Sequence, residues 1–159
     1  MNVSIKHGST EEMLELWNGR YESFEESYIK NIESGIQEVW LIKDEETHIF
    51  IGEIHIIWDC NDKSQANGLD TAYILSFEVN PAFQGKKLGS ALIRRALQRI
   101  RDKGYAKATI GADDADGEKL CAMYKSWGFT KEVKRDSFEY MEDGQTIICT
   151  YSPLLNDTL

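Results

Sequence analysis

The sequence of residues 71–103 predicts an apolar strand, a proline, a glycine-containing turn and an amphipathic helix that follow one another directly. Thr71 to Asn80 is apolar on both faces over most of its length, which is typical of a central strand covered on both sides. Pro81 then ends this strand because proline cannot continue a ladder of hydrogen bonds. The helix that we expect next can end at Gly104. One side of it carries an apolar stripe made of Leu88, Leu92, Ala96 and Ile100, and the opposite side carries basic residues. A strand that passes so directly into a helix favours an α/β arrangement.

The connection between this strand and this helix has the properties of an anion-binding loop. Backbone N–H groups at the start of a helix have no partner within it and lie at its positive end. Gly85 and Gly89 let a phosphate approach the main chain, and Lys86 and Lys87 add positive charge. The glycine spacing is neither G-x-G-x-x-G nor G-x-x-x-x-G-K-[ST], which argues against dinucleotide and nucleotidase loops. The residues alone therefore predict a phosphate-bearing ligand without naming it.

Charge is distributed unevenly along the chain. The net charge is −9, yet eight Lys or Arg residues against Asp102 alone give residues 84–107 a charge of +7 and leave −16 for the rest. Nucleic acid is an improbable partner, because binding a polyphosphate backbone needs an extended basic surface. A small anionic ligand and a cationic second substrate suit this distribution, although basic helix surfaces also serve solubility alone.

Shorter elements surround the central segment. Ser9 to Glu12 has the form of a capping box, and Gly35 can end a helix. Periodicity predicts helices within residues 10–34 and 120–127, with strands at 3–6, 38–43, 47–59, 107–111, 130–141 and 145–151, the last two joined by a turn at Asp143-Gly144. The length suits one domain over residues 1–159. This order predicts a mixed α/β domain.

Cysteine and histidine spacings predict no metal site. Cys60, Cys121 and Cys149 are odd in number and far apart, and the three histidines form no i, i+4 pair. No apolar run approaches the roughly twenty residues of a membrane helix, and the first residues lack a basic start followed by an apolar stretch. We therefore expect a cytoplasmic protein without a membrane partner.

Two motifs resemble those of the GNAT superfamily of N-acetyltransferases. Gln84 to Gly89 resembles the acetyl-CoA loop [QR]-x-x-G-x-[GA] and follows a strand ending in V-x-P, here Val79-Asn80-Pro81, with Lys87 in place of the inner glycine. Met123 to Phe129 resembles the later signature L-Y-x-x-x-G-F. The resemblance covers residues 71–129 well and the remainder through element order. Upstream of the second motif, Gly117 and Leu120 replace the Asn and Ala that the family often has.

The resemblance implies a GNAT-like fold, in which a mixed and mostly antiparallel sheet is flanked by helices. Its central strand would splay from a neighbour so that the pantetheine arm of the coenzyme inserts. Acetyl-CoA would be the co-substrate, and no metal would be needed. The coenzyme-binding residues implied are Phe77 and Val79 through their backbone, and Gln84, Gly85, Lys86, Lys87, Leu88, Gly89 and Ser90 in the loop.

Acetyl transfer from a thioester needs a neutral amine, a polarised carbonyl and a proton for the departing thiolate. By resemblance Tyr124 supplies that proton, although its helical spacing also suits a packing role. Glu78 is our candidate base, directly or through water, because a carboxylate on an apolar strand is costly; a strand-end position or an arginine partner would also explain it. Glu53 and His55 share a strand face and either supply a base or form a satisfied polar pair.

We expect an N-acetyltransferase that acts on a primary amine of a small molecule or peptide, by direct attack in a ternary complex. The alternative is a non-catalytic acyl-CoA-binding sensor or interaction domain, and a third reading is an unrelated phosphate-binding α/β protein. The acidic remainder of the chain favours a cationic acceptor. The identity of the acceptor, the acyl chain length and the oligomeric state stay open, a homodimer included.

Overall fold

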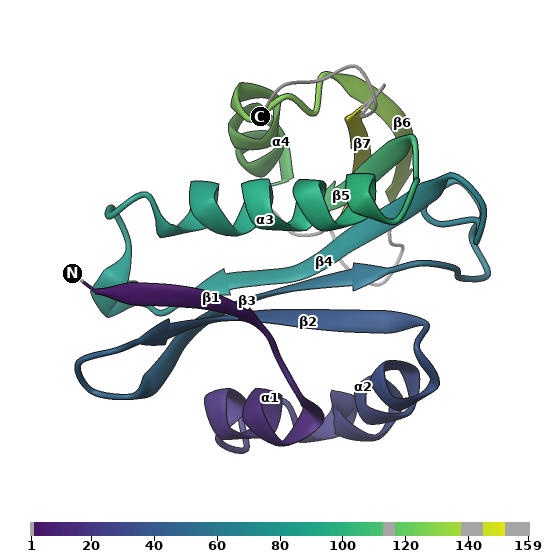
Figure 1. Cartoon of the computed structure of the whole chain (residues 1–159). Coiled ribbons are helices and arrows are strands. Elements are labelled where there is room, and N and C mark those ends of the chain that lie inside the picture. Colours follow the sequence, from purple (N-terminus) through teal and green to yellow (C-terminus); the bar gives the residue numbers. More distant parts are fainter. Residues whose placement is uncertain (1, 113–116, 138–144, 152–159) are drawn as a thin grey trace. The chain divides into compact units, whose positions relative to one another are not determined.

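The computed structural model describes residues 2–112, 117–137 and 145–151. Its elements follow the predicted order (Figure 1). The predicted turn at Asp143-Gly144 lies outside the described residues. The elements are β1 (Val3–His7), α1 (Thr10–Trp17), α2 (Glu22–Ser34), β2 (Gln37–Asp44), β3 (Ile49–Ile57), β4 (Thr71–Val79), the 3₁₀-helix η1 (Pro81–Phe83), α3 (Leu88–Asp102), β5 (Lys107–Ala112), α4 (Gly117–Ser126), β6 (Lys131–Ser137) and β7 (Gln145–Tyr151).

The strands form one seven-stranded sheet in the order β1-β2-β3-β4-β5-β7-β6. Neighbours in the pairs β1–β2, β2–β3, β5–β7 and β6–β7 are antiparallel, whereas β4 pairs with β5 in parallel over Thr71–Ile74 and Lys107–Ile110. The predicted mixed and mostly antiparallel sheet is confirmed. The chain divides into a first unit of Met1–Ile57 and Ser76–Ala96, and a second unit of Trp58–Leu75 and Leu97–Leu159.

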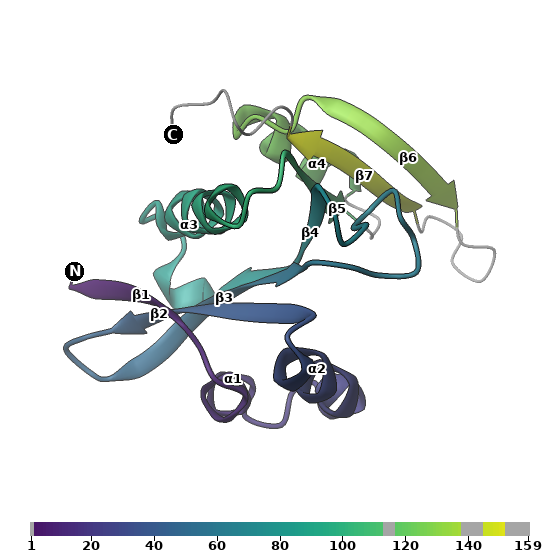
Figure 2. The same ribbon diagram turned by 45° about the vertical axis from the view of Figure 1, so that its right-hand side comes forward.

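In the first unit, α1 and α2 lie along one face of β2 and β3 (Figures 1 and 2). The predicted capping box is present, since Ser9 and Glu12 each accept a hydrogen bond from the other's backbone N–H, at 3.1 Å and 3.0 Å. Alternation along β2 turns its odd-numbered residues toward these helices. They contribute to a buried core made of Met13, Trp17, Val39, Leu41 and Phe50. Trp40 has the opposite orientation, with the guanidinium of Arg95 on α3 lying 4.6 Å from its ring centre.

Strand β4 is irregular at Ser76, whose φ of 51° lies in the left-handed region. Before Ser76 the buried positions are Thr71, Ala72 and Ile74, and after it the buried position is the odd-numbered Val79, so strict alternation is not kept along the strand. The Ser76 hydroxyl lies 2.5 Å from the hydroxyl of Tyr28 on α2. The irregularity therefore changes which side chains β4 presents on each face just before the loop.

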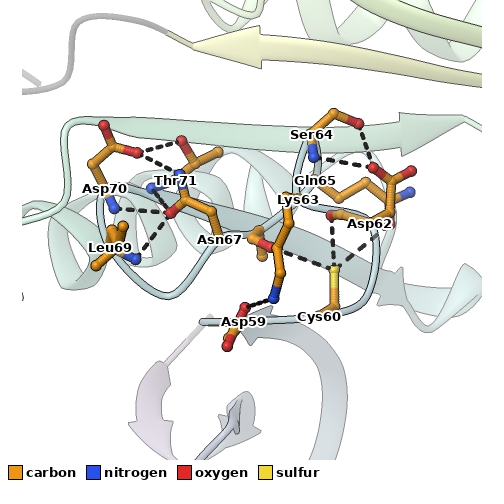
Figure 3. Close-up of polar contacts among 11 residues, drawn as sticks. Asp59, Cys60, Asp62, Lys63, Ser64, Gln65, Asn67, Leu69, Asp70 and Thr71 are labelled. Carbon is orange, nitrogen blue, oxygen red and sulfur yellow. Dashed lines mark hydrogen bonds and ion pairs between the residues drawn. The ribbon is translucent and has the colours of Figure 1, made fainter.

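The second unit is built around α4, which packs on β5 and β7. Phe129 is completely buried, and its ring meets that of Tyr151 edge-on at 5.4 Å. Residues 58–70 connect β3 to β4 and hold their shape by side-chain hydrogen bonds (Figure 3). Oδ1 of Asn67 accepts the backbone N–H groups of Leu69, Asp70 and Thr71 at 2.9–3.1 Å. No helix among the described residues is long and apolar enough to cross a membrane.

Candidate functional site

The predicted loop after β4 begins with two side chains that fix the end of the strand. Asn80 caps η1, because its Oδ1 accepts the N–H of Ala82 at 3.0 Å. The side chain of Gln84 turns back and donates to the carbonyl oxygen of Val79 at 3.1 Å. Gln84 therefore closes the loop onto the strand that precedes it.

The loop then presents a run of backbone N–H groups at the start of α3. Gly85 and Lys87 both have positive φ, 81° and 62°, and Leu88 begins the helix. The first helical hydrogen bond runs from Ala91 N–H to the carbonyl of Lys87 at 3.2 Å. The N–H groups of residues 85–90 have no acceptor in the part of the chain that the structure describes. Together with the helix dipole and two exposed lysines, this arrangement suits an anion such as a phosphate.

The conformation of Lys87 accounts for the one departure from the loop motif. A residue with φ near 60° is strained unless it is glycine, which explains why the motif has a glycine at this position. Lys87 adopts the same left-handed conformation with a side chain, and it stays exposed. The loop thus keeps the backbone course that the glycine would allow and adds a positive charge.

Glu78 is held by two residues from the connection between α1 and α2. Nη1 of Arg20 lies 3.1 Å from its Oε1, and the hydroxyl of Tyr21 donates to its Oε2 at 2.9 Å. The arginine partner is one of the explanations that the sequence left open for a carboxylate on this strand. Burial, and next the hydrogen bond with Glu78, raise the pKa of Tyr21 above its ordinary value of 10.0. The Glu78 side chain remains 34% exposed, so it is open to a ligand.

Glu53 and His55 form the satisfied polar pair that the sequence allowed, and both are buried. Nε2 of His55 lies 2.5 Å from Oε1 of Glu53, and the indole N–H of Trp17 donates to both carboxylate oxygens, at 3.0 Å and 2.8 Å. Nδ1 of His55 lies 2.8 Å from Nε2 of Gln37. The sequence did not predict Trp17 as a partner of Glu53 or Gln37 as a partner of His55, because these partners are 36 and 18 residues apart in the chain.

A pocket of about 420 Å³ brings the two carboxylates into one site within the first unit. Its apolar walls come from α1, β3 and η1, and its acidic groups include an exposed residue of α1. The lining residues are Glu15, Leu16, Asn18, Arg20, Ile49, Phe50, Glu53, Glu78, Asn80 and Pro81. Three carboxylates against one guanidinium make the pocket acidic, so it suits a cationic ligand.

The remaining predicted site residues occupy defined positions in their own units. In the first unit Val79 is buried at the end of β4, and Phe77 is half-buried on the same strand. Tyr124 belongs to the second unit, where it is 5% exposed and packs against Trp127 and Phe129. No group of three or more potential metal-binding side chains occurs within residues 2–112, 117–137 and 145–151.

Comparison with known proteins connects this arrangement to one family. The family model described as Acetyltransferase (GNAT) family matches residues 9–129. An uncharacterized N-acetyltransferase of Methanocaldococcus jannaschii is 29% identical over 140 residues, which cover 82% of this chain and 61% of that protein. The chain thus spans less than two thirds of this curated relative.

Solved structures share the fold at low sequence identity. A GNAT family acetyltransferase from Elizabethkingia anophelis with acetyl-CoA bound superimposes with a TM-score of 0.68 at 18% identity, over 95% of this chain and 98% of that one. An acetyltransferase from Salmonella typhimurium with its cofactor acetyl-CoA gives 0.71 at 15% identity, over 100% and 97%. A chimeric spermidine N-acetyltransferase from Vibrio cholerae gives 0.74 at 17% identity, over 99% and 100%.

Proposed function

Since the chain belongs to the acetyltransferase (GNAT) family, we propose that it transfers an acetyl group from acetyl-CoA to a primary amine of a small molecule or peptide. The loop after β4 carries this proposal. Six consecutive N–H groups without an acceptor among the described residues, two left-handed residues and two lysines form a cradle for the coenzyme's pyrophosphate. The residues assigned to this cradle are Gln84, Gly85, Lys86, Lys87, Leu88, Gly89 and Ser90.

The proposed roles of Phe77, Val79, Glu78 and Tyr124 follow from the chemistry. The backbone of Phe77 and Val79 would pair with the pantetheine arm, as an added strand pairs with a sheet edge. The acceptor nitrogen attacks the thioester carbonyl, so that a C–N bond forms and the C–S bond breaks. Glu78, or a water that it holds, takes the proton that the nitrogen loses. Tyr124 gives a proton to the departing sulfur.

The loop geometry also bears on the alternative of a domain that binds acyl-CoA without turnover. That alternative depends partly on the missing loop glycine, and Lys87 adopts the backbone conformation that a glycine would have there. The replacement of glycine by Lys87 therefore leaves the backbone course of the loop intact and does not by itself favour the sensor. The cytoplasmic location, the single domain and the oligomeric state stay predictions.

Two measurements on the purified protein test the proposal. Titration calorimetry with acetyl-CoA asks whether the coenzyme binds, and release of the free thiol in the presence of a panel of amines asks whether it reacts. We expect binding together with thiol release for at least one amine. Binding without release for every amine would favour the acyl-CoA sensor, and no binding of any CoA thioester would exclude both functions.

A further inference from the structure

The acidic pocket of the first unit contains two carboxylates that have different partners. Glu78 is paired with the guanidinium of Arg20, whereas Glu53 has an indole and an imidazole as its neighbours. The two carboxylates come from adjacent strands, β3 and β4. Asn80 N–H donates to the carbonyl of Ile51 at 2.8 Å, which sets residues 51–53 beside residues 78–80. Arg20 thus balances the charge of Glu78, whereas no lysine or arginine among the described residues is paired with Glu53.

Neighbouring side chains hold the carboxylate of Glu53 in place. The indole N–H of Trp17 donates to both of its oxygens, and Nε2 of His55 lies 2.5 Å from Oε1. Nδ1 of His55 lies 2.8 Å from Nε2 of Gln37, and Oε1 of Gln37 lies 3.4 Å from Nδ2 of Asn31. These contacts fix the orientation of the Glu53 carboxylate.

Glu53 is 2% exposed, yet it has no lysine or arginine partner in the part of the chain that the structure describes. A buried carboxylate is costly unless a cation compensates it. Its two oxygens have about four lone-pair positions, and the contacts with Trp17 and His55 leave room for another donor. A cationic group of a ligand that enters the pocket can therefore donate a further hydrogen bond to Glu53 and bring a positive charge to it.

We propose that the acceptor is a linear diamine or polyamine, and that Glu53 anchors the amino group that does not react. The proposal depends on the proposed function only for the fate of the other amino group, which would react beside Glu78. The pocket walls include Leu16, Ile49, Phe50 and Pro81, and these apolar side chains suit the methylene linker between the two nitrogens. Trp17 and His55 are positioning residues, because they contact the carboxylate of Glu53 and do not line the pocket.

The test compares 1,4-diaminobutane with butylamine, which has the same carbon chain and lacks the second amino group. The wild type should favour the diamine in kcat/KM by about tenfold or more, because a hydrogen bond between charged groups is worth about that ratio. Glu53→Gln keeps the shape and an acceptor for Trp17 but removes the charge. It should raise KM for the diamine about tenfold, change kcat by less than about threefold, and leave butylamine unaffected.

Two further variants keep the test independent of folding. Glu11→Gln removes an exposed carboxylate of α1 that does not line the pocket and should change KM for the diamine by less than about twofold. Ile49→Lys, at a pocket residue that is 57% exposed, introduces a positive charge without disturbing the core. It should raise KM for the diamine severalfold more than KM for butylamine, even if Glu53→Gln does not fold.

Calorimetric titration with 1,4-diaminobutane separates this proposal from the proposed function. Binding that depends on Glu53, without release of thiol from acetyl-CoA, would support the pocket assignment and contradict acetyl transfer. Equal kcat/KM for the two amines in the wild type would overturn the pocket assignment. So would a Glu53→Gln variant that loses both amines equally.

Discussion

The hydroxyl of Tyr21 donates a hydrogen bond of 2.9 Å to the carboxylate of Glu78, the residue that we propose as the general base. Burial and this contact raise the pKa of Tyr21 above 10.0. The folded protein therefore keeps a proton that the unfolded chain loses, so stability is present up to about pH 10 and falls as the pH rises toward the folded pKa.

The Tyr21→Phe substitution should flatten this alkaline loss, measured as the change in urea midpoint between about pH 9 and about pH 11. Tyr105, whose pKa burial also raises, provides the matched comparison. Tyr105→Phe should remove a separate part of the alkaline loss of stability, and the double variant should remove the contributions of both tyrosines. An unchanged slope in Tyr21→Phe would contradict the assignment of a raised pKa to this tyrosine.

Glu78→Gln should lower kcat/KM for the acceptor by about a hundredfold or more, because it removes the proposed acceptor of the amine's proton. The amide oxygen still accepts a hydrogen bond from Tyr21, so the denaturation midpoint should change little. Glu11→Gln is the control, since it removes the same charge at an exposed position of α1 outside the pocket. Turnover close to that of the wild type would exclude Glu78 as the base.

The loop makes a prediction about backbone conformation at Lys87, where φ is 62°. Lys87→Val should destabilise the protein by about 1–2 kcal/mol, because a β-branched residue is poorly tolerated in the left-handed region. Lys86→Val removes the same charge at a position without positive φ and should have little effect on stability. Both should weaken acetyl-CoA binding in calorimetry, with the larger loss for Lys87→Val. Equal stability of the two variants would contradict this account of the loop.

Gly128 tests the packing of the second motif. A Cβ at this position would lie 2.1 Å from Cε2 of Tyr151, and φ is 107°. Gly128→Ala should therefore destabilise the protein by about 2–4 kcal/mol in urea unfolding, through steric overlap and backbone strain together. Gly104→Ala is the matched control, because φ is 91° there and no atom lies within 4 Å of the added carbon. A loss of stability no larger than that of Gly104→Ala would show that the ring of Tyr151 can move to accommodate the added carbon at little cost.

Tyr124→Phe separates a proton donor from a packing residue. The variant keeps the ring contacts with Trp127 and Phe129 and removes the hydroxyl. We expect kcat to fall about a hundredfold, while the dissociation constant of acetyl-CoA changes by less than about twofold. Unchanged turnover would remove Tyr124 as the acid and leave it a packing role.

Sequence patterns predicted the elements whose signals are local. The capping box at Ser9, the left-handed cap at Gly35 and the helix from Leu88 each depend on residues within a few positions of one another. The loop after β4 could be predicted for the same reason, since its strand stop, glycines and lysines are adjacent in the chain. The positive φ of Lys87 could have been expected from the glycine that the motif has there.

The acceptor pocket could not be predicted, because its contacts join distant segments. Glu78 meets Arg20 and Tyr21 across 57–58 residues, and Glu53 meets Trp17 across 36 residues. No spacing rule connects a carboxylate on β4 to an arginine after α1. The positive φ of Ser76 could not be predicted from sequence either. Such a conformation within a strand depends on how the neighbouring strands pair rather than on the residue type.

Product analysis tests acetyl transfer most directly. The protein is incubated with acetyl-CoA and an amine panel that includes 1,4-diaminobutane, and mass spectrometry identifies acetylated amine while free thiol is measured in parallel. We predict one acetylated amine for each thiol released, at a rate well above that without protein. Thiol release and amine acetylation no faster than in the protein-free control, for every amine in the panel, would contradict the assignment of this protein as an N-acetyltransferase.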